Sequence, residues 1–464
     1  MIKKIFTNSF GILFSRILGF IRDLLSASIL GANIYSDIFF IAFKFPNLFR
    51  RIFAEGAFTQ SFLPSYISSK YKVSFAITIF IRFFLIIAAF SILVTLFPTF
   101  FTKLLAFGFD DELINLASKY VAINFYYLDF IFVVTFLASL LQHKEHFATT
   151  AFSTALLNLS LISALLIYQK SDKESIVFAM SIAVLIGGAL QLLVHIYAAN
   201  RLNILKKLVV AFRSKKKIVQ KDIKRFYKNF FPAIFGNSTA QISAFLDTWL
   251  ASFLVSGSIS YLYYANRVFQ LPLALFAIAT ATAIFPSISK KLKTNNESEA
   301  KEILKKSFWF LTFLLSMFTI GGIILSEEIV WLLFERGSFS SIDTLNTSLV
   351  LSMYLIGLIP YGLNKLFSLW LYANHKQIVA AKIATYSLIS NIFLSIILIF
   401  FMQAAGLALA SSIAGFVLLL FTLKEFGFKE FLKFFTFKKI FLLTILLSIE
   451  FLILYLFKIF LFRI

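Results

Sequence analysis

Ionisable residues recur within one apolar segment of this chain at spacings that place them on a single helix face. Asp37, Lys44 and Arg51 are seven residues apart, and Glu55 lies four residues beyond Arg51. At about 100° per residue, all four fall within about 40° of one line along a helix. A charge at the centre of a bilayer costs about 2.5–3.5 kcal/mol on insertion scales, so such residues usually face a bundle interior or a water-filled cavity.

Two other apolar segments carry charges in the same way. Arg16 and Asp23 are seven residues apart and share a helix face, with Arg22 to the side, and Arg267 lies in a later segment. The set holds more cations than acids: it comprises Arg16, Arg22, Lys44, Arg50, Arg51 and Arg267 against Asp23, Asp37 and Glu55. Guanidinium groups match phosphate oxygens bidentately. The sequence therefore predicts an anionic, phosphorylated substrate held within the membrane.

Snorkelling is the competing interpretation, because long cationic side chains near helix ends reach the headgroups without any further role. It accounts for Arg82 and also fits Arg50 and Arg51, which are close to an expected membrane surface. It fits Arg16 and Arg267 poorly, since both have apolar residues on either side. Pro46 and Pro272 interrupt two of the charged segments and are candidate hinges.

Composition places these segments in a polytopic membrane protein. The chain has 464 residues, of which 60% are hydrophobic, against roughly 45–50% in soluble globular chains. Its apolar runs are long and apolar on all sides, which favours helices over barrel strands and predicts an all-α bundle. There are no cysteines, and the four histidines form no convincing metal pattern. The first apolar stretch lacks a small-residue cleavage site and is expected to be the first span.

We expect thirteen membrane spans, at 5–28, 34–62, 75–100, 115–140, 148–168, 175–199, 226–255, 260–285, 306–333, 345–372, 378–401, 404–423 and 438–461. With the N-terminus in the cytoplasm, Lys and Arg gather in the even loops, as the positive-inside rule requires. Most of the net charge of +22 is therefore topological. A nucleic-acid partner is not expected, because the chain has no soluble basic domain to read one.

The spans divide into two lobes. Spans one to six occupy 1–200, a basic cytoplasmic linker occupies 201–225, spans seven to twelve occupy 226–423, and 424–464 holds an interfacial helix with one or two further spans. Short words recur about 222 residues apart, such as FLPS at 62–65 and IFPS at 284–287. Six spans is an even number, so the two lobes form a parallel repeat, which is a common plan for alternating-access transporters.

Long motifs in this chain resemble the MurJ (MviN) family of lipid II flippases. The resemblance rests on SRILGFIRDLLSASILGANIYSDIFFIAFKFPNLFRRIFAEGAFTQSFLPSY at 15–66 and YYANRVFQLPLALFAIATATAIFPSIS at 263–289. LLFERGSF at 332–339 and GLIPYGLNKLF at 357–367 extend it, so that it covers about the first 425 residues. It implies a transporter of the MOP superfamily, with two MATE-like six-helix lobes around a V-shaped cationic cavity.

The resemblance also implies a substrate, a site and a location. The substrate would be undecaprenyl-pyrophosphate carrying the disaccharide-pentapeptide, moved from the cytoplasmic to the periplasmic leaflet of the bacterial inner membrane without ATP. The family's essential arginines fall on Arg16, Arg22, Arg50 and Arg267, and its charged partners on Asp23, Asp37 and Glu55. Energy would come from the membrane potential or an ion gradient, of Na⁺ or H⁺. Membrane lipids and the cell-wall synthesis machinery would be further partners.

Two details of the resemblance leave alternatives open. Some relatives bind Na⁺ between spans seven and eleven, so Asp247 and Asn391 are candidate oxygen ligands, although a polar pair that stabilises helix packing is the alternative. The family usually has fourteen spans, whereas an amphipathic basic stretch and one span follow Lys424 here.

Three other functions are compatible with parts of the sequence. A MOP exporter of drugs or of another polyprenyl-linked glycan would share the fold, and the motif at 15–66 argues against it. A membrane glycosyltransferase would need catalytic acids or histidines in larger outer loops. A scaffold for cell-wall assembly would tolerate replacement of the intramembrane arginines.

Overall fold

The computed structural model describes residues 2–50, 57–213 and 219–462, with side chains except at 2–9, 235–240 and 461–462. These residues form helices joined by short loops, and no strand occurs among them, which confirms the all-α prediction. The chain divides into two compact units, Met1–Ser256 and Gly257–Ile464, and each is described by itself. Arg51 and Glu55 lie outside the described residues.

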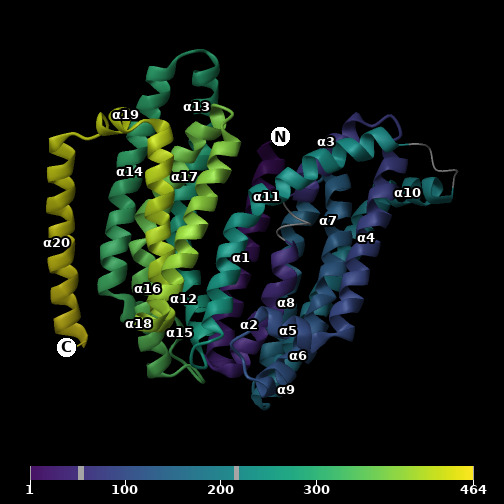
Figure 1. The fold of residues 1–464 in the computed structure, drawn as a ribbon, viewed down its shortest axis with the longest axis horizontal. Coiled ribbons are helices and arrows are strands. Elements are labelled where there is room, and N and C mark those ends of the chain that lie inside the picture. The colour runs from purple at the N-terminus through teal and green to yellow at the C-terminus, as the bar shows by residue number, and fades with distance from the viewer. Residues whose placement is uncertain (1, 51–56, 214–218, 463–464) are drawn as a thin grey trace. The chain divides into compact units, whose positions relative to one another are not determined.

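The helices of the first unit are drawn in purple to teal in Figure 1. They are α1 (Ile2–Leu30), α2 (Ile34–Phe49), α3 (Thr59–Ser68), α4 (Lys72–Leu96), α5 (Pro98–Leu105), α6 (Asp111–Phe125), α7 (Tyr127–His143), α8 (Ala148–Tyr168), α9 (Lys173–Arg201), α10 (Ile204–Arg213) and α11 (Gln220–Ala251).

The second unit is drawn in green to yellow. It contains α12 (Ser258–Pro272), the π-helix η2 (Leu273–Ile278), α13 (Ala279–Lys293), α14 (Glu297–Ile324), α15 (Ser326–Phe334), α16 (Ser341–Ile356), α17 (Leu358–Ala373), α18 (Gln377–Phe426), α19 (Phe428–Leu432) and α20 (Phe437–Phe462).

Polar residues with capping side chains begin several of these helices, and apolar residues fill their interiors. The Asn33 side chain accepts a hydrogen bond from the Tyr35 amide at the start of α2, and Asp110 and Asp172 cap α6 and α9 in the same way. Apolar side chains cannot compete for backbone hydrogen bonds, so each interior stays helical and satisfies its own amides and carbonyls, as lipid requires.

Nine helical stretches of the described residues are long and apolar enough to cross a membrane, so the chain is a multi-pass membrane protein. One of them, Ala148–Tyr168, has the bounds of the predicted span. Another, α18, combines two predicted spans into a helical hairpin, because the chain reverses at Gln403, where φ is 49° and ψ is −128°. Ser387 donates to the Ala414 carbonyl at 2.8 Å across that hairpin.

Helix α11 contacts α3, α2 and α4, and it lies within the first compact unit. The predicted organisation instead places it, as span seven, at the start of the second lobe. The predicted linker at 201–225 and second lobe at 226–423 therefore stay a prediction. The compact units of this structure meet at a different boundary, between Ser256 and Gly257.

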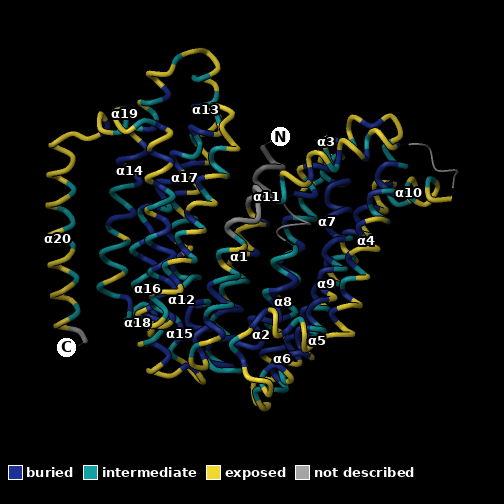
Figure 2. Tube along the Cα trace, viewed as in Figure 1, coloured by how far each residue is buried: buried dark blue, intermediate teal, exposed yellow. Residues whose placement is uncertain are grey.

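The C-terminal helix α20 runs parallel to α14, which lies beside it in Figure 1. Lys439 near the start of α20 stacks over Trp309 in the middle of α14. Near the end of α20, Lys458 donates to the Ile324 carbonyl at the end of α14, at 3.2 Å, and lies 3.0 Å from a carboxylate oxygen of Glu328 in α15. Short α19 joins them to the bundle through Phe431, whose ring contacts Phe308. Figure 2 shows α20 largely exposed, so within the described residues one further span follows the second unit's bundle.

Candidate functional site

Two of the predicted charges in the first unit, Arg22 and Asp23, form a buried ion pair. The two residues are 7% and 3% exposed and lie in α1, which contains the first predicted span. Arg22 donates from Nη2 to Asp23 Oδ1 at 2.6 Å and from Nε to the same oxygen at 3.1 Å. Removing either partner from a buried pair typically leaves an uncompensated charge that destabilises a protein by about 3–5 kcal/mol.

Asn158 of α8 completes this cluster from the neighbouring helix. Its Oδ1 accepts from Arg22 Nη1 at 3.0 Å, while its Nδ2 donates to the Ser15 carbonyl at 3.0 Å. Asn158 therefore ties the guanidinium of α1 to α8 and fixes the plane of the fork. The sequence analysis did not select Asn158, although a lone asparagine within the apolar segment 148–168 is the kind of signal that marks an interhelical contact.

Glycines of α1 let α8 pack close to it, which brings Asn158 within reach of Arg22. A Cβ added at Gly11 would lie 2.9 Å from Ala151 Cβ, and one added at Gly19 would lie 3.5 Å from Asn158 Nδ2. The tightest approach is therefore at Gly11, and Gly19 sits in ordinary contact with the asparagine that holds Arg22.

Arg16 occupies a different environment from Arg22, because its side chain is exposed. Their spacing along α1 places Arg16 and Asp23 on one face, but the carboxylate of Asp23 accepts from Arg22. Local geometry explains the difference, since a side chain one residue away can fold back onto its neighbour when a second helix holds it there.

Lys44 of α2 reaches towards α11. Its ammonium donates to the Ala244 carbonyl and to the Thr248 hydroxyl, both one turn apart on that helix. Asp37 is 2% exposed in the first turn of α2, where the helix dipole favours a negative charge. Arg50 is half-buried at the end of α2. The charged face of the segment 34–62 is thus described as far as Arg50.

Arg267 lies on α12 of the second unit and is half-buried. Its guanidinium stacks over the Tyr263 ring, 4.8 Å from the centroid, and Nη2 donates to the Tyr263 hydroxyl at 2.8 Å. Tyr263 is one turn away on the same helix, so a single side chain both stacks on the cation and accepts its hydrogen bond. The sequence analysis did not single out this tyrosine.

Both candidate hinges lie beside irregular helix. Pro272 ends α12, and the π-helical segment η2 follows it directly. Pro46 lies inside α2, and Arg50, Ala57 and Phe58 are also π-helical. Single π-helical turns are frequent at functional sites. The hinge role of both prolines stays a prediction.

The two candidate Na⁺ ligands belong to different compact units. Asp247 is buried in α11 at 8% exposure, and Asn391 is buried in α18 at 2%. Asn391 Oδ1 accepts from Ser395 and Ser411 hydroxyls at 3.4 Å, which links the two arms of the α18 hairpin. No group of three or more metal-binding side chains occurs in the part of the chain that the structure describes. The Na⁺ site stays a prediction.

The arrangement is suited to binding an anion without bond-making chemistry. Arg22 holds a fixed, buried fork that Asp23 and Asn158 orient, and such a fork can exchange a carboxylate for phosphate oxygens. Arg267 supplies a second guanidinium whose orientation a neighbouring ring controls.

Comparisons with known proteins give one consistent result. The family model described as "Lipid II flippase MurJ" matches residues 26–463. A protein of Helicobacter pylori (strain ATCC 700392 / 26695), named probable lipid II flippase MurJ, is 51% identical over 417 residues, covering 88% of this chain and 90% of that protein. Its counterpart in Buchnera aphidicola subsp. Acyrthosiphon pisum (strain APS) is 34% identical over 434 residues, covering 90% and 82%.

Solved structures agree at the level of the fold. The structure titled "Lipid II flippase MurJ, inward closed conformation" superposes with a TM-score of 0.80 at 30% identity and covers 98% of each chain. An inward-facing multidrug-resistance MATE transporter of the MOP superfamily gives a TM-score of 0.64 at 11% identity, covering 88% of this chain and 92% of that one, which shows a shared fold alone.

Proposed function

This chain belongs to the lipid II flippase MurJ family, and from that premise we propose how its own residues move lipid II across the membrane. The protein is a lipid II flippase with the MOP transporter fold. The observation that carries this conclusion is the family match over residues 26–463, which spans both compact units. Flipping moves an intact molecule, and a transporter of this kind acts by alternating access.

Arg22 is the residue that we propose to receive the pyrophosphate in the first unit. Its guanidinium is already oriented by Asp23 and Asn158, so little side-chain freedom is lost on binding. Asp23 would then play two parts. It neutralises Arg22 in the absence of substrate, and it competes with the pyrophosphate when the headgroup must leave, because a site without a competitor would bind too tightly to release.

Arg267 and Arg16 are proposed as the other pyrophosphate-binding arginines. Tyr263 limits the directions in which the Arg267 guanidinium can point. Lys44, Arg50 and Arg51 would raise the local concentration of the anionic headgroup at the cytoplasmic mouth, through the focused positive field of a cleft. For Lys44 this requires release from α11, so its hydrogen bonds with Ala244 and Thr248 are proposed to break during transport.

We further propose that the protein lies in the bacterial inner membrane with its N-terminus in the cytoplasm. Support comes from the bias of Lys and Arg towards alternate loops, including eleven in the stretch 201–228 against the single acid Asp222. Transport would then run from the cytoplasmic to the periplasmic leaflet. An Na⁺ or H⁺ gradient is the proposed energy source, and the cell-wall synthesis machinery the proposed recipient of the product.

Depletion of the protein tests the function. Cells that lose it should accumulate lipid II in the inner leaflet, while total synthesis of the precursor continues. Unchanged access of lipid II to an external probe would contradict the function. Native mass spectrometry of the lipid retained by the purified chain distinguishes lipid II from the drug or other glycan that a different MOP exporter would carry.

The assignment of Arg267 has its own test. Arg267→Ala should abolish flipping while the protein still inserts, because the pyrophosphate loses a guanidinium. Arg82→Ala is the matched control, since Arg82 is an exposed arginine on α4 whose role is explained by snorkelling. Growth supported by Arg267→Ala at normal expression would remove Arg267 from the site.

A further inference from the structure

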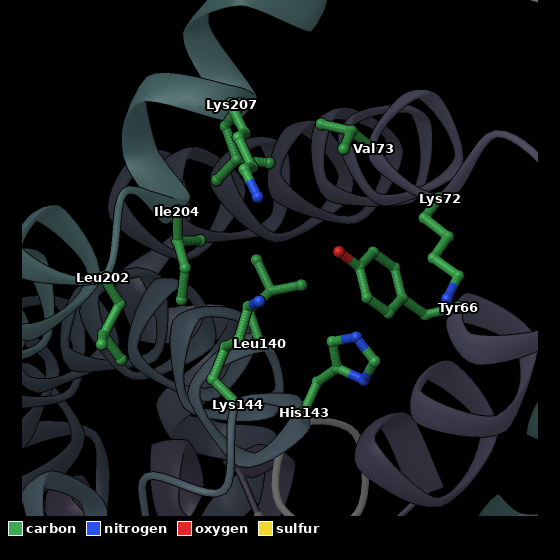
Figure 3. A pocket seen from close by; sticks show the side chains of 10 residues that line it. Tyr66, Lys72, Val73, Leu140, His143, Lys144, Leu202, Ile204 and Lys207 are labelled. Carbon is green, nitrogen blue, oxygen red and sulfur yellow. The ribbon is translucent and has the colours of Figure 1, made fainter.

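A small hollow opens at one end of the first unit, where α3, α4, α7 and α10 meet (Figure 3). Its volume is about 210 Å³, several times the ~30 Å³ that one water occupies in the liquid. It is lined by Tyr66, Lys72, Val73, Leu140, His143, Lys144, Leu202, Ile204, Lys207 and Leu208. None of these residues belongs to α1, α2 or α12, which carry the proposed transport site.

Three ammonium groups, a phenol and an imidazole share this hollow with apolar side chains. Lys72, Lys144 and Lys207 come from three different segments, and no carboxylate is among the lining residues. Salt bridges described across residues 2–50, 57–213 and 219–462 include none of these three lysines. The rings of Tyr66 and His143 meet edge-to-face, with centroids 5.1 Å apart. The hollow is therefore a concentration of positive charge and hydrogen-bond donors.

Helix α10 places this hollow at the level of lipid headgroups. Its apolar Val209, Val210 and Phe212 are 49%, 60% and 62% exposed, although they lie beside lysines and an arginine. A short amphipathic helix with exposed apolar side chains among several cations is typical of a segment that lies in the membrane interface. The hollow also adjoins the start of α4 and the ends of α7 and α9, where apolar spans meet water.

We propose that this hollow binds the phosphate of an anionic phospholipid headgroup. Three lysines and the Tyr66 hydroxyl supply donors for phosphate oxygens, and basic pockets between membrane helices are suited to such headgroups. The volume is below the roughly 300–1,000 Å³ of sites for drug-sized ligands, so the glycopeptide headgroup of the transported substrate does not fit. The apolar face of α10 favours a lipid over free phosphate, because acyl chains would lie against it.

A bound lipid would fix α10 to the first unit. Helix α10 packs on α4 and α9 and leads into the basic linker that follows. A headgroup held by Lys207 of α10, Lys72 of α4 and Lys144 after α7 would join three segments that are far apart in sequence. The lipid would therefore act as a structural ligand outside the transport route.

The test uses the full chain with Lys72, Lys144 and Lys207 all changed to Gln. Wild type and variant are placed in vesicles of phosphatidylcholine containing phosphatidylglycerol, and retained phosphatidylglycerol is counted by native mass spectrometry. The matched control changes Lys70, Lys206 and Lys221 to Gln, which removes the same charge from exposed lysines that do not line the hollow. Tyr66→Phe removes one donor and leaves the charge unchanged.

Loss of the three lining lysines should weaken phosphatidylglycerol binding by about tenfold or more, since each cation near a membrane surface contributes on the order of 1 kcal/mol. The control should lose much less, and Tyr66→Phe should show a smaller loss. Equal losses in the two triple variants would overturn the site. Inorganic phosphate, added to the chain in phosphatidylcholine alone, should bind weakly at best. Tight phosphate binding there, lost in the lining variant, would overturn the lipid as occupant.

Discussion

The Arg22 cluster and the lysine-lined hollow are both cationic, but they hold charge in opposite ways. Arg22 is buried, and its fork is held by a carboxylate on its own helix and an amide on the next. The three lysines of the hollow lie at one end of the unit, on α4, on α10 and just after α7, and they are half-buried or exposed. The Arg22 cluster is therefore rigid and neutralised before any ligand binds, whereas the lysines of the hollow are adaptable and remain positively charged.

This difference separates two costs of holding a cation in a membrane protein. Burial of Arg22 is compensated inside the fold, so loss of any member should reduce stability as well as function. The lysines remain hydrated and contribute little to folding, so their loss should affect only what binds them. A net charge of +22 does not distinguish these cases, since both add to the same total.

Arg22→Ala should give the largest effect. It leaves the Asp23 carboxylate buried beside a hole and should lower the free energy of unfolding by about 3–5 kcal/mol, with loss of lipid II flipping. Thermal unfolding of the purified chain and a flipping assay measure both. The double variant Arg22→Ala, Asp23→Ala should recover part of the stability but none of the flipping. A double variant no more stable than the single one would show that the buried charge is not the cause.

Asn158→Ala should come next, because it removes the amide that joins the Arg22 guanidinium to α8. A hydrogen bond to a charged group contributes about 1.5–3 kcal/mol, which sets the expected loss of unfolding free energy. Ser160→Ala on the same helix is the control, since its hydroxyl donates only to the Leu156 carbonyl one turn away. If both variants melt at the same temperature as wild type, the Asn158 amide does not hold the Arg22 cluster rigid.

Salt should affect the lysine-lined hollow far more than the Arg22 cluster. Raising the ionic strength from 0.1 to 1 M shortens the Debye length from about 10 to about 3 Å, which screens the exposed lysines far more than a buried pair. Phosphatidylglycerol retention should therefore fall, while the stability difference between wild type and Arg22→Ala stays constant. The lysine triple variant itself should change unfolding free energy by no more than about 0.5 kcal/mol per substitution.

The partly exposed ion pairs that Glu430 of α19 makes with Lys301 and Lys433 should give the smallest effect. The Lys301 and Lys433 ammonium groups lower the pKa of the Glu430 carboxyl from its ordinary value of 4.5 to about 2. Because the pKa is lower in the folded protein, the stabilisation is complete above about pH 4.5 and is lost as the pH falls towards 2. Glu430→Gln should remove that part of the pH dependence together with the stabilisation present at neutral pH, which is small because the ion pairs are partly exposed and screened by solvent. A large loss of stability in Glu430→Gln at neutral pH would show that the Glu430 ion pairs resemble the buried Arg22–Asp23 pair.

Prediction of the candidate site from the sequence was best where one helix decides the answer. The charged face predicted for 34–62 follows from residue spacing, because a helix repeats every 3.6 residues, and the structure describes it as far as Arg50. Spacing did not identify which arginine holds Asp23, and Asn158, Thr248 and Tyr263 were missed. A contact between helices depends on how they pack and rotate, and a partner in the same helix depends on its rotamer. Neither kind of contact can be predicted from the periodicity of a single segment.

The sequence by itself determined that this chain is an all-α membrane protein and which family it resembles. Those properties follow from apolar length and local hydrogen bonding, which each segment settles alone, and from motifs too long to arise by chance. Tertiary structure decided which cations are buried and which remain accessible. It also packed α11 against α3 and brought three distant lysines around one hollow, because burial and proximity arise only when separate helices exclude water from each other.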